Sequence, residues 1–284
     1  MARVLVGTAG GLLVLPGTAA PLLDGDLTAL ARGPDGWWAL VGRREVWRQG
    51  GDGWRRLTEL PGPPGNCLLA DAGGAWVGTA EAHLVRVSEE GTEPVGSFEA
   101  VPGRAEWYTP WGGPPDVRSL AAGPDGVLYA NVHVGGIPRS VDGGATWEPT
   151  IEVDADVHQV LAAPLPAGRV LAATARGLAV SEDAGTSWRF ETEGLHAAYC
   201  RAVAVVGGTV LLSASRGPRG GGAALYRRPL EGGAFERCRD GLPEWFDANL
   251  DTHTLHAEDG LAALGTPDRR VLASDDEGAT WREL

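Results

Sequence analysis

The segment SVDGGATW, Ser140–Trp147, returns twice more along this 284-residue chain with small changes. The later copies are SEDAGTSW, Ser181–Trp188, and SDDEGATW, Ser274–Trp281. In each copy an aspartate follows the first serine, then a glycine, and a tryptophan ends the segment. Short apolar runs flank every copy, so the pattern predicts a tight turn that recurs between strands.

This Ser-x-Asp-x-Gly-x-Thr-Trp pattern resembles the Asp-box, or bacterial neuraminidase repeat, of sialidases, sortilin-type receptors and photosystem assembly factors. The resemblance implies a β-propeller in which each box joins the third and fourth strands of a blade. It also implies that the Asp caps backbone amides, the Gly takes a positive φ, and the Trp packs between blades. We therefore interpret Asp142, Asp183, Asp275 and Asp276 as turn residues rather than as calcium ligands or general acids. Because these relatives share no single chemistry, function must be argued from other residues.

A period of about 40 residues divides the chain into one partial and six complete repeats. The partial repeat covers 2–24 and lacks a first strand. The complete repeats are expected at 27–57, 66–98, 117–151, 156–192, 199–240 and 249–284. We predict an all-β fold with minimal helix: one seven-bladed β-propeller domain, 1–284, with a short N-terminal blade. Six blades is the alternative, and Val101–Asp116 is expected as an insertion before the third complete repeat, 117–151.

The amino-acid composition excludes several classes of binding partner and several classes of catalytic chemistry. Forty-three glycines, twenty prolines and eleven tryptophans suit many short strands joined by tight turns. A formal charge of -13 argues against nucleic acid or an anionic membrane as partner, because both require a basic face. All 24 basic residues are arginines. The absence of lysine excludes Schiff-base chemistry, pyridoxal phosphate attachment and a P-loop, and we expect no nucleotide cofactor.

The cysteines and the first residues bear on the cellular compartment. The chain has three cysteines without metal-type spacing, Cys67, Cys200 and Cys238. We predict buried or free thiols in a reducing compartment, hence a cytoplasmic and monomeric protein. The apolar run Val4–Leu15 can imitate a secretory signal, but Val6–Thr8 matches segments of later repeats and indicates a structural start. No stretch approaches the length of a membrane helix.

The histidines point to one face of the expected propeller, opposite the Asp-boxes. Five of the six fall on loops of that face: His83, His133, His158, His196 and His253. Aligning the innermost strands puts one residue of each complete repeat at the entrance of the central channel: Thr28, Cys67, Arg118, His158, Cys200 and His253. We predict a divalent transition metal, zinc or manganese, held by His133, His158 and His253, with His196 as an alternative donor. The competing interpretation is ordinary hydrogen-bonding histidines, since no short metal motif is present.

Tyr199 is the leading candidate for proton transfer. It is expected to begin an innermost strand near His196 and Arg201, whose positive charge would lower the pKa of a phenol. His196 and Asp156 are the other catalytic candidates. The alternative is that Tyr199 packs into its blade with its hydroxyl bonded to backbone.

Arginines and aromatic residues supply candidate ligand contacts. Arg118 and Arg139 are predicted to clamp a ligand carboxylate. Trp107, with Tyr108, Trp111 and Trp245, is predicted to form a wall on which a sugar stacks, unless the insertion uses its aromatics only to fold itself. Sialidase activity is disfavoured, because the Arg-Ile-Pro signature that the resemblance implies is absent. Only Ile137–Arg139, in the reverse order, comes near it.

Two functions from different classes remain. In the first, the histidine-bearing face binds a small polar or anionic molecule, over a metal, and hydrolyses or eliminates a carbohydrate-like substrate. In the second, the propeller is a non-catalytic scaffold whose rim holds a protein. The titratable groups on one face favour the first, because a scaffold needs apolar and aromatic patches more than facing imidazoles.

Overall fold

The computed structural model describes residues 3–17, 20–164 and 166–284. Almost all regular structure in these residues is β-strand, as predicted. The helices among them are four short 3₁₀ turns: η1 (Ala80–Ala82), η2 (Gly96–Ala100), η3 (Arg104–Glu106) and η4 (Val153–Ala155). Within the same residues no helix is long and apolar enough to cross a bilayer.

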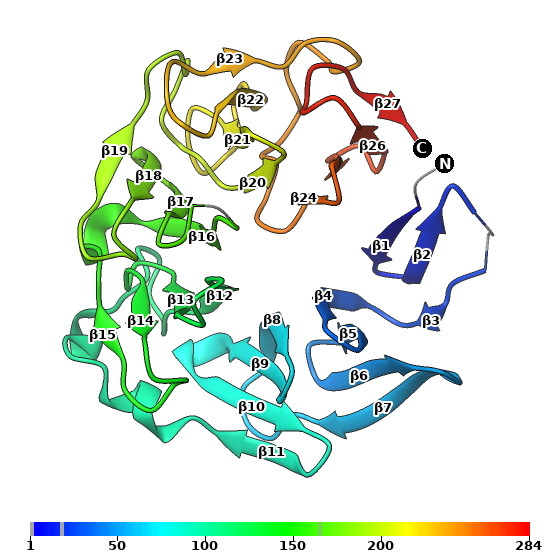
Figure 1. Cartoon of the computed structure of the whole chain (residues 1–284), viewed down its shortest axis with the longest axis vertical. Helices are drawn as coiled ribbons and strands as arrows, with labels where there is room; N and C mark the ends of the chain where they lie inside the picture. Colours follow the sequence, from blue (N-terminus) through cyan, green and yellow to red (C-terminus); the bar gives the residue numbers. More distant parts are fainter. Residues whose placement is uncertain (1–2, 18–19, 165) are drawn as a thin grey trace. The chain divides into compact units, whose positions relative to one another are not determined.

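The strands form seven antiparallel sheets, whose strand order follows the chain and is labelled in Figure 1. Sheets 1 to 4 comprise β1 (Val4–Thr8), β2 (Gly11–Leu15), β3 (Leu23–Asp24); β4 (Leu27–Gly33), β5 (Gly36–Val41), β6 (Glu45–Gly50), β7 (Gly53–Glu59); β8 (Gly65–Asp71), β9 (Gly74–Thr79), β10 (Leu84–Ser88), β11 (Gly91–Pro94); and β12 (Val117–Ala122), β13 (Leu128–Val132), β14 (Pro138–Ser140), β15 (Glu148–Pro149). Sheets 5 to 7 comprise β16 (Val157–Ala162), β17 (Val170–Thr174), β18 (Gly177–Ser181), β19 (Arg189–Glu191); β20 (Val203–Val206), β21 (Thr209–Ala214), β22 (Ala224–Pro229), β23 (Glu236–Arg237); and β24 (Leu255–Glu258), β25 (Leu261–Gly265), β26 (Val271–Ser274), β27 (Arg282–Glu283).

This is a seven-bladed β-propeller, as predicted, and the six-bladed alternative is wrong. Sheet 1 has three strands where the other sheets have four, so the short N-terminal blade is also confirmed. Packing divides the chain into two compact units. Unit 1, Met1–Ala122 with Gly126–Pro149, holds sheets 1 to 4, and unit 2, Gly123–Asp125 with Thr150–Leu284, holds sheets 5 to 7.

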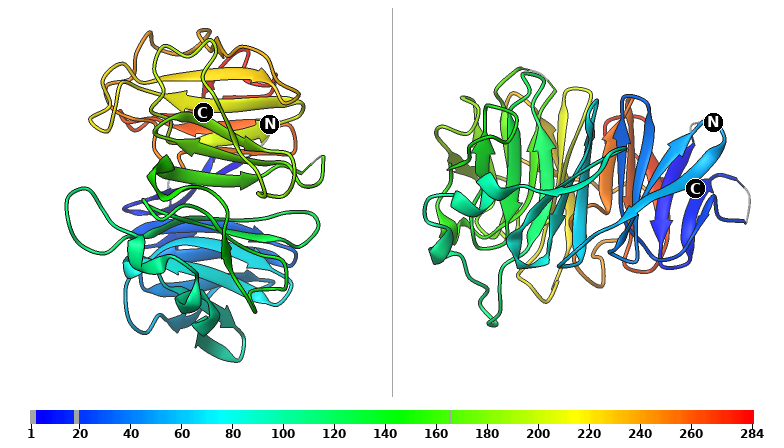
Figure 2. Two further views of the ribbon diagram at one scale, coloured as in Figure 1. Left: turned by 90° about the vertical axis from the view of Figure 1, so that its left-hand side faces the viewer. Right: turned by 90° about the horizontal axis from the view of Figure 1, so that it is seen from below.

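The core of each unit lies between neighbouring sheets, which Figure 2 shows from two sides. The middle strands β9, β17 and β18 are buried at every position. In unit 2, Leu211 and Leu225 of sheet 6 share one apolar cluster with Leu264 and Trp281 of sheet 7. Such side chains come from alternate strand positions and hold the sheets face to face.

Each Asp-box connects the third and fourth strands of its sheet, as predicted: β14 to β15, β18 to β19 and β26 to β27. In the first box the amide of Thr146 donates to Asp142 Oδ1 at 2.9 Å, and the amide of Gly144 donates to Ser140 Oγ at 2.8 Å. Equivalent bonds surround Asp183 and Asp276. These carboxylates therefore cap their turns, which is their expected structural role.

The box aspartates should give the protein an acid-sensitive stability. Hydrogen bonds from Thr146 and Ser140 lower the pKa of Asp142 to about 2, and equivalent bonds lower the pKa of Asp183 and Asp276 to about 2. A lowered folded-state pKa contributes stability above the unfolded value of about 3.9, and this contribution is lost as pH falls through about 2. Urea unfolding between pH 5 and pH 2 should show this loss. The variant carrying Asp142→Asn, Asp183→Asn and Asp276→Asn should lose less stability over the window.

The exposed Val141 in the same turn provides the control, since Val141→Ala removes no charge. Its pH profile should match that of the unmodified protein. An identical profile for the triple asparagine variant would contradict the assignment of the carboxylates as stabilising caps.

The cysteines and the insertion follow the prediction. All three cysteines are free and buried. Burial raises the pKa of Cys67 and of Cys238 to about 12, so these thiols are inert. The predicted insertion Val101–Asp116 lies between β11 and β12 and contains η3.

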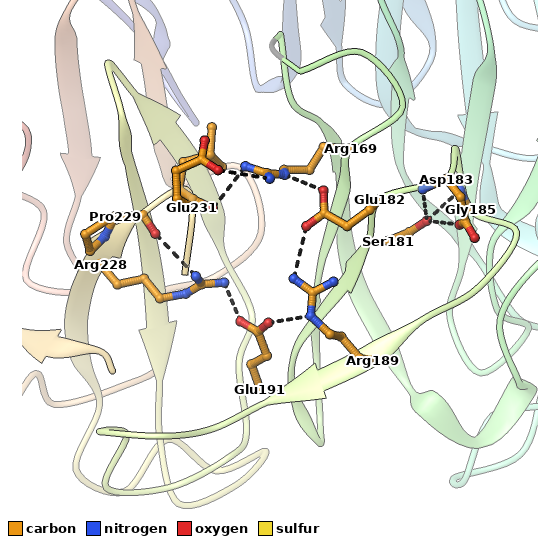
Figure 3. Close-up of polar contacts among 11 residues, drawn as sticks. Arg169, Ser181, Glu182, Asp183, Gly185, Arg189, Glu191, Arg228, Pro229 and Glu231 are labelled. Carbon is orange, nitrogen blue, oxygen red and sulfur yellow. Dashed lines mark hydrogen bonds and ion pairs between the residues drawn. The ribbon is translucent and has the colours of Figure 1, made fainter. Parts of the chain in front are cut away.

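An alternating series of charges joins sheets 5 and 6 inside unit 2 (Figure 3). Arg228 pairs with Glu191, which also accepts from Arg189 Nε at 2.8 Å. Arg189 Nη2 lies 3.0 Å from Glu182, and Arg169 Nε lies 2.7 Å from the other oxygen of Glu182. Each carboxylate in this charge ladder thus bridges two guanidinium groups.

Candidate functional site

His158 lies near the start of β16 and is fully buried. Its Nδ1 is 2.7 Å from the carbonyl oxygen of Cys200, which can only accept, so Nδ1 carries a proton and, in the neutral ring, Nε2 carries the lone pair. Nε2 lies 3.6 Å from Oδ1 of Asp156, too far for an N–H···O hydrogen bond. Two ligands at about 2.1 Å from one tetrahedral ion are about 3.4 Å apart. The His158–Asp156 pair therefore has the spacing of two ligands on one metal.

Local backbone explains how the carboxylate reaches the ring. Asp156 follows η4 and has a φ of 48°, a left-handed conformation that aspartate tolerates better than most residues. The first pairing of β16 with β17 also carries a register shift between Val157 and Gln159, so a bulge falls at His158. Bulges re-aim side chains at strand ends.

Tyr199 and Arg201 come from the segment that enters sheet 6. The ring of Tyr199 lies 4.7 Å from the ring of His158, tilted by 57°. The guanidinium carbon of Arg201 lies 5.8 Å from the Tyr199 ring, and Arg201 forms an ion pair with Asp251. Tyr199 thus has an imidazole and a cation beside its ring.

The segment that leads into sheet 7 supplies the remaining residues around His158 and Tyr199. Thr252 Oγ1 lies 3.0 Å from the carbonyl oxygen of His158 and 3.1 Å from that of Arg201, so its hydroxyl donates to both strand entrances. His253, the predicted metal ligand, is exposed and has a φ of 67° in the same turn. We call the resulting set the His158 cluster: Asp156, His158, Tyr199, Arg201, Asp251 and Thr252.

His196 belongs to a different group of side chains in unit 2. Its Nδ1 lies 2.7 Å from the hydroxyl of Tyr226, and its ring lies 4.9 Å from that of Trp245. Partial burial lowers the pKa of His196, the positive charges of Arg216 and Arg237 lower it further, and a hydrogen bond to the Gly222 backbone opposes them. The imidazole is therefore neutral at pH 7. We call His196, Arg216, Tyr226, Arg237 and Trp245 the Trp245 cluster.

Unit 1 holds His133 and the aromatic insertion. His133 is buried, and its ring stacks on Trp111 with centroids 4.9 Å apart. Trp107 is buried as well, 5.8 Å from the ring of Phe98, with the guanidinium of Arg104 4.8 Å from its own ring. Trp107 is thus a packing residue of the insertion, whereas Trp111 is 68% exposed.

The two predicted ligand arginines lie on different strands of sheet 4. Arg118 is on β12, and Arg139 is on β14, where it pairs with Glu148 of β15. Unit 1 also contains a groove of about 640 Å³ that was not predicted from the sequence and is lined by Asp71 and Arg86 among others. Arg86 is bonded to Asp71 there, so its charge is already compensated.

The comparisons with known proteins identify the fold of the chain but not its function. No family model and no curated protein matches the chain. Among solved structures, a GH74 xyloglucanase from Xanthomonas campestris matches the whole chain with a TM-score of 0.67 at 18% identity, and the chain spans 47% of that enzyme. A catalytically inactive virginiamycin B lyase from Staphylococcus aureus, solved with quinupristin, has a TM-score of 0.64 at 11% identity over 90% of this chain and 83% of its own.

A third similar structure is the Pan2 WD40 domain of Neurospora crassa, with a TM-score of 0.62 at 10% identity, covering 97% of this chain and 84% of that one. Enzymes and a WD40 domain thus share this architecture. The chain is a β-propeller, and its function must come from its own side chains.

Thr252 was not predicted as a site residue, although it directly precedes His253, which had been aligned at the channel entrance. His196 was expected near Tyr199, three positions away in the sequence. The contact of His196 with Tyr226 and Trp245 depends on loop paths that no sequence period encodes.

Proposed function

We propose that this protein binds a small polar or anionic ligand at the His158 cluster, over a divalent transition metal held by His158 and Asp156. The observation that carries the proposal is the 3.6 Å spacing of His158 Nε2 and Asp156 Oδ1. The carbonyl of Cys200 fixes the ring from behind through Nδ1, which is the usual support for a metal-bound imidazole. The remaining ligands predicted from the sequence are His253 and His133, and zinc or manganese suits such a mixed set.

The residues around the pair suit a polar ligand. His158 is enclosed and so fits a metal ligand better than a group that touches substrate. Tyr199 is partly exposed, and its hydroxyl is the group we assign to proton transfer in a hydrolysis or elimination. Arg201 supplies a positive charge beside it, although Asp251 shares that charge.

The metal is the most direct test. Protein purified without a histidine tag and dialysed against zinc or manganese should retain about one ion per chain by plasma emission analysis. His158→Ala should abolish retention, because the imidazole is a ligand. Asp156→Asn, which preserves shape, should weaken retention by about 10-fold or more.

His83→Ala is the matched control, because His83 is a partly exposed histidine that pairs with Glu99 in unit 1. It should retain the ion fully. Failure of the unmodified protein to retain either metal, or unchanged retention in both His158→Ala and Asp156→Asn, would refute the metal site.

A second candidate is a protein-interaction scaffold. The observation that favours it is the pair of exposed aromatics on the insertion, Trp111 at 68% and Tyr108 at 44%. Exposed tryptophan and tyrosine are typical of protein-binding hot spots. We expect this function if the metal test fails.

A further inference from the structure

We propose that the Trp245 cluster is a second binding site in unit 2, which takes a small ligand bearing a carboxylate on a flat ring. The indole of Trp245 is 37% exposed on the loop that follows β23. The guanidinium carbon of Arg237 lies 3.8 Å from its ring centroid, and that of Arg216 lies 6.0 Å away. The site therefore offers an aromatic face with two cations against it.

Within the described part of the chain Arg216 and Arg237 have no acidic partner, in contrast to the arginines of the charge ladder. Arg169, Arg189 and Arg228 all pair with glutamates. Neither Arg216 nor Arg237 forms an ion pair or a side-chain hydrogen bond with any described residue, and Nη2 of Arg237 is enclosed without an acceptor. Two guanidinium groups without an acidic partner therefore lie against one tryptophan, in a chain whose formal charge is -13.

The charged side chains that act on His196 and Tyr226 are arginines. The charged side chains that shift the pKa of His196 are Arg216 and Arg237, and Arg237 and Arg239 lower the pKa of Tyr226. Burial raises the pKa of Tyr226 by a larger effect, so the hydroxyl stays neutral and donates to His196. His196 and Tyr226 are thus an uncharged pair next to the positively charged side chains of Arg216 and Arg237. Such a site attracts an anion, and guanidinium groups bind carboxylates by paired hydrogen bonds.

Gly222, just before β22, borders the region that the side chains of the cluster share. Gly222 has a φ of 63°, and a Cβ built there would lie 3.5 Å from Trp245, 3.6 Å from Arg216 and 3.7 Å from His196. A side chain at this position would occupy the region that these three groups share. Glycine therefore keeps this region free of a side chain, and a ring that packs there beside the indole can bring its carboxylate to the arginines.

Titration with ring compounds tests this site. We would follow the indole N–H signal of Trp245 by NMR while adding glucuronate, glucose, benzoate or benzyl alcohol, with a chelator present to remove metal. Glucuronate binding in preference to glucose indicates a sugar acid as the ligand, and benzoate in preference to benzyl alcohol indicates an aromatic carboxylate. Either result supports the site. No saturable shift with glucuronate or benzoate overturns it.

Three variants test whether the NMR signal of Trp245 reports binding at the Trp245 cluster. Arg237→Gln and Arg216→Gln should each weaken carboxylate binding at least 10-fold, and Gly222→Asn, which tolerates the positive φ, should block it. Arg32→Gln is the control, because Arg32 also lies over an indole, 6.0 Å from Trp37, in unit 1. Equal affinity in Arg237→Gln and Arg32→Gln would overturn the proposal. His158→Ala should bind normally, which separates this site from the proposed metal site.

Discussion

Replacing Gly241 by alanine is expected to destabilise the protein by about 3 kcal/mol or more and to lower its Tm by roughly 5–10 °C. Gly241 has a φ of 79°, and a Cβ there would lie 1.8 Å from the carbonyl oxygen of Trp281. No rotamer relieves this contact, because both groups are backbone. The amide of Trp281 also donates to the carbonyl of Asp240 at 3.0 Å, so the two segments cannot separate without losing that bond.

The same arrangement occurs one sheet earlier, which shows that it is a repeated device. A Cβ at Gly194 would lie 2.1 Å from the carbonyl oxygen of Phe235, and the amide of Phe235 donates to Glu193 at 2.8 Å. In each case the glycine lies in the segment that leaves one sheet and runs against the next. It allows that segment to approach the neighbouring backbone closely.

Gly208→Ala is the matched control in unit 2. A Cβ at Gly208 would meet nothing within 4 Å, and its φ is not in the left-handed region. Its free energy of unfolding should change by less than about 0.5 kcal/mol. Differential scanning calorimetry of the two variants checks the pair. Equal Tm values for Gly241→Ala and Gly208→Ala would mean that the close approach does not constrain the fold.

The fold was predictable because its signal is local and repeated. Each Asp-box carries its own capping residues within eight positions, so Asp142, Asp183 and Asp276 form the same bonds wherever the box occurs. The blade count followed from the period that separates the boxes and their degenerate copies. By contrast, the Asp/Glu-Gly-Leu sequence at Gly194 and Gly241 was also repeated but was not recognised. Its role depends on the backbone of the next sheet, which is distant in sequence.

The candidate site was predictable only where strand register determined it. His158 lies near the start of β16, and its ring is 4.7 Å from that of Tyr199, although Tyr199 precedes β20 (Val203–Val206) instead of beginning it as predicted. The partner of His196 could not be inferred, because Trp245 arrives on a loop after β23 and no period fixes its path. The insertion was similar: its composition indicated an aromatic cluster, but only packing distinguishes the buried Trp107 from the exposed Trp111.

The charge ladder between sheets 5 and 6 leads to the second large expected effect (Figure 3). The side chain of Arg228 is 1% exposed and pairs with Glu191, and burial lowers the pKa of Arg228. Arginine nevertheless remains charged at pH 7. Glu191→Gln should therefore leave a buried cation without a counter-charge and destabilise the protein by about 3 kcal/mol. Urea unfolding at pH 7 measures this loss.

Two further variants distinguish an uncompensated charge from a simple loss of contacts. Arg228→Met combined with Glu191→Gln removes the buried cation as well, so stability should return to within about 1 kcal/mol of the unmodified protein. Glu283→Gln alters a glutamate on the fourth strand of sheet 7, whose contact with Arg270 is exposed and 3.9 Å long, and should cost less than about 0.5 kcal/mol. If the double variant is as unstable as Glu191→Gln alone, the loss arises from the contacts of Glu191 with Arg189 rather than from the buried charge of Arg228.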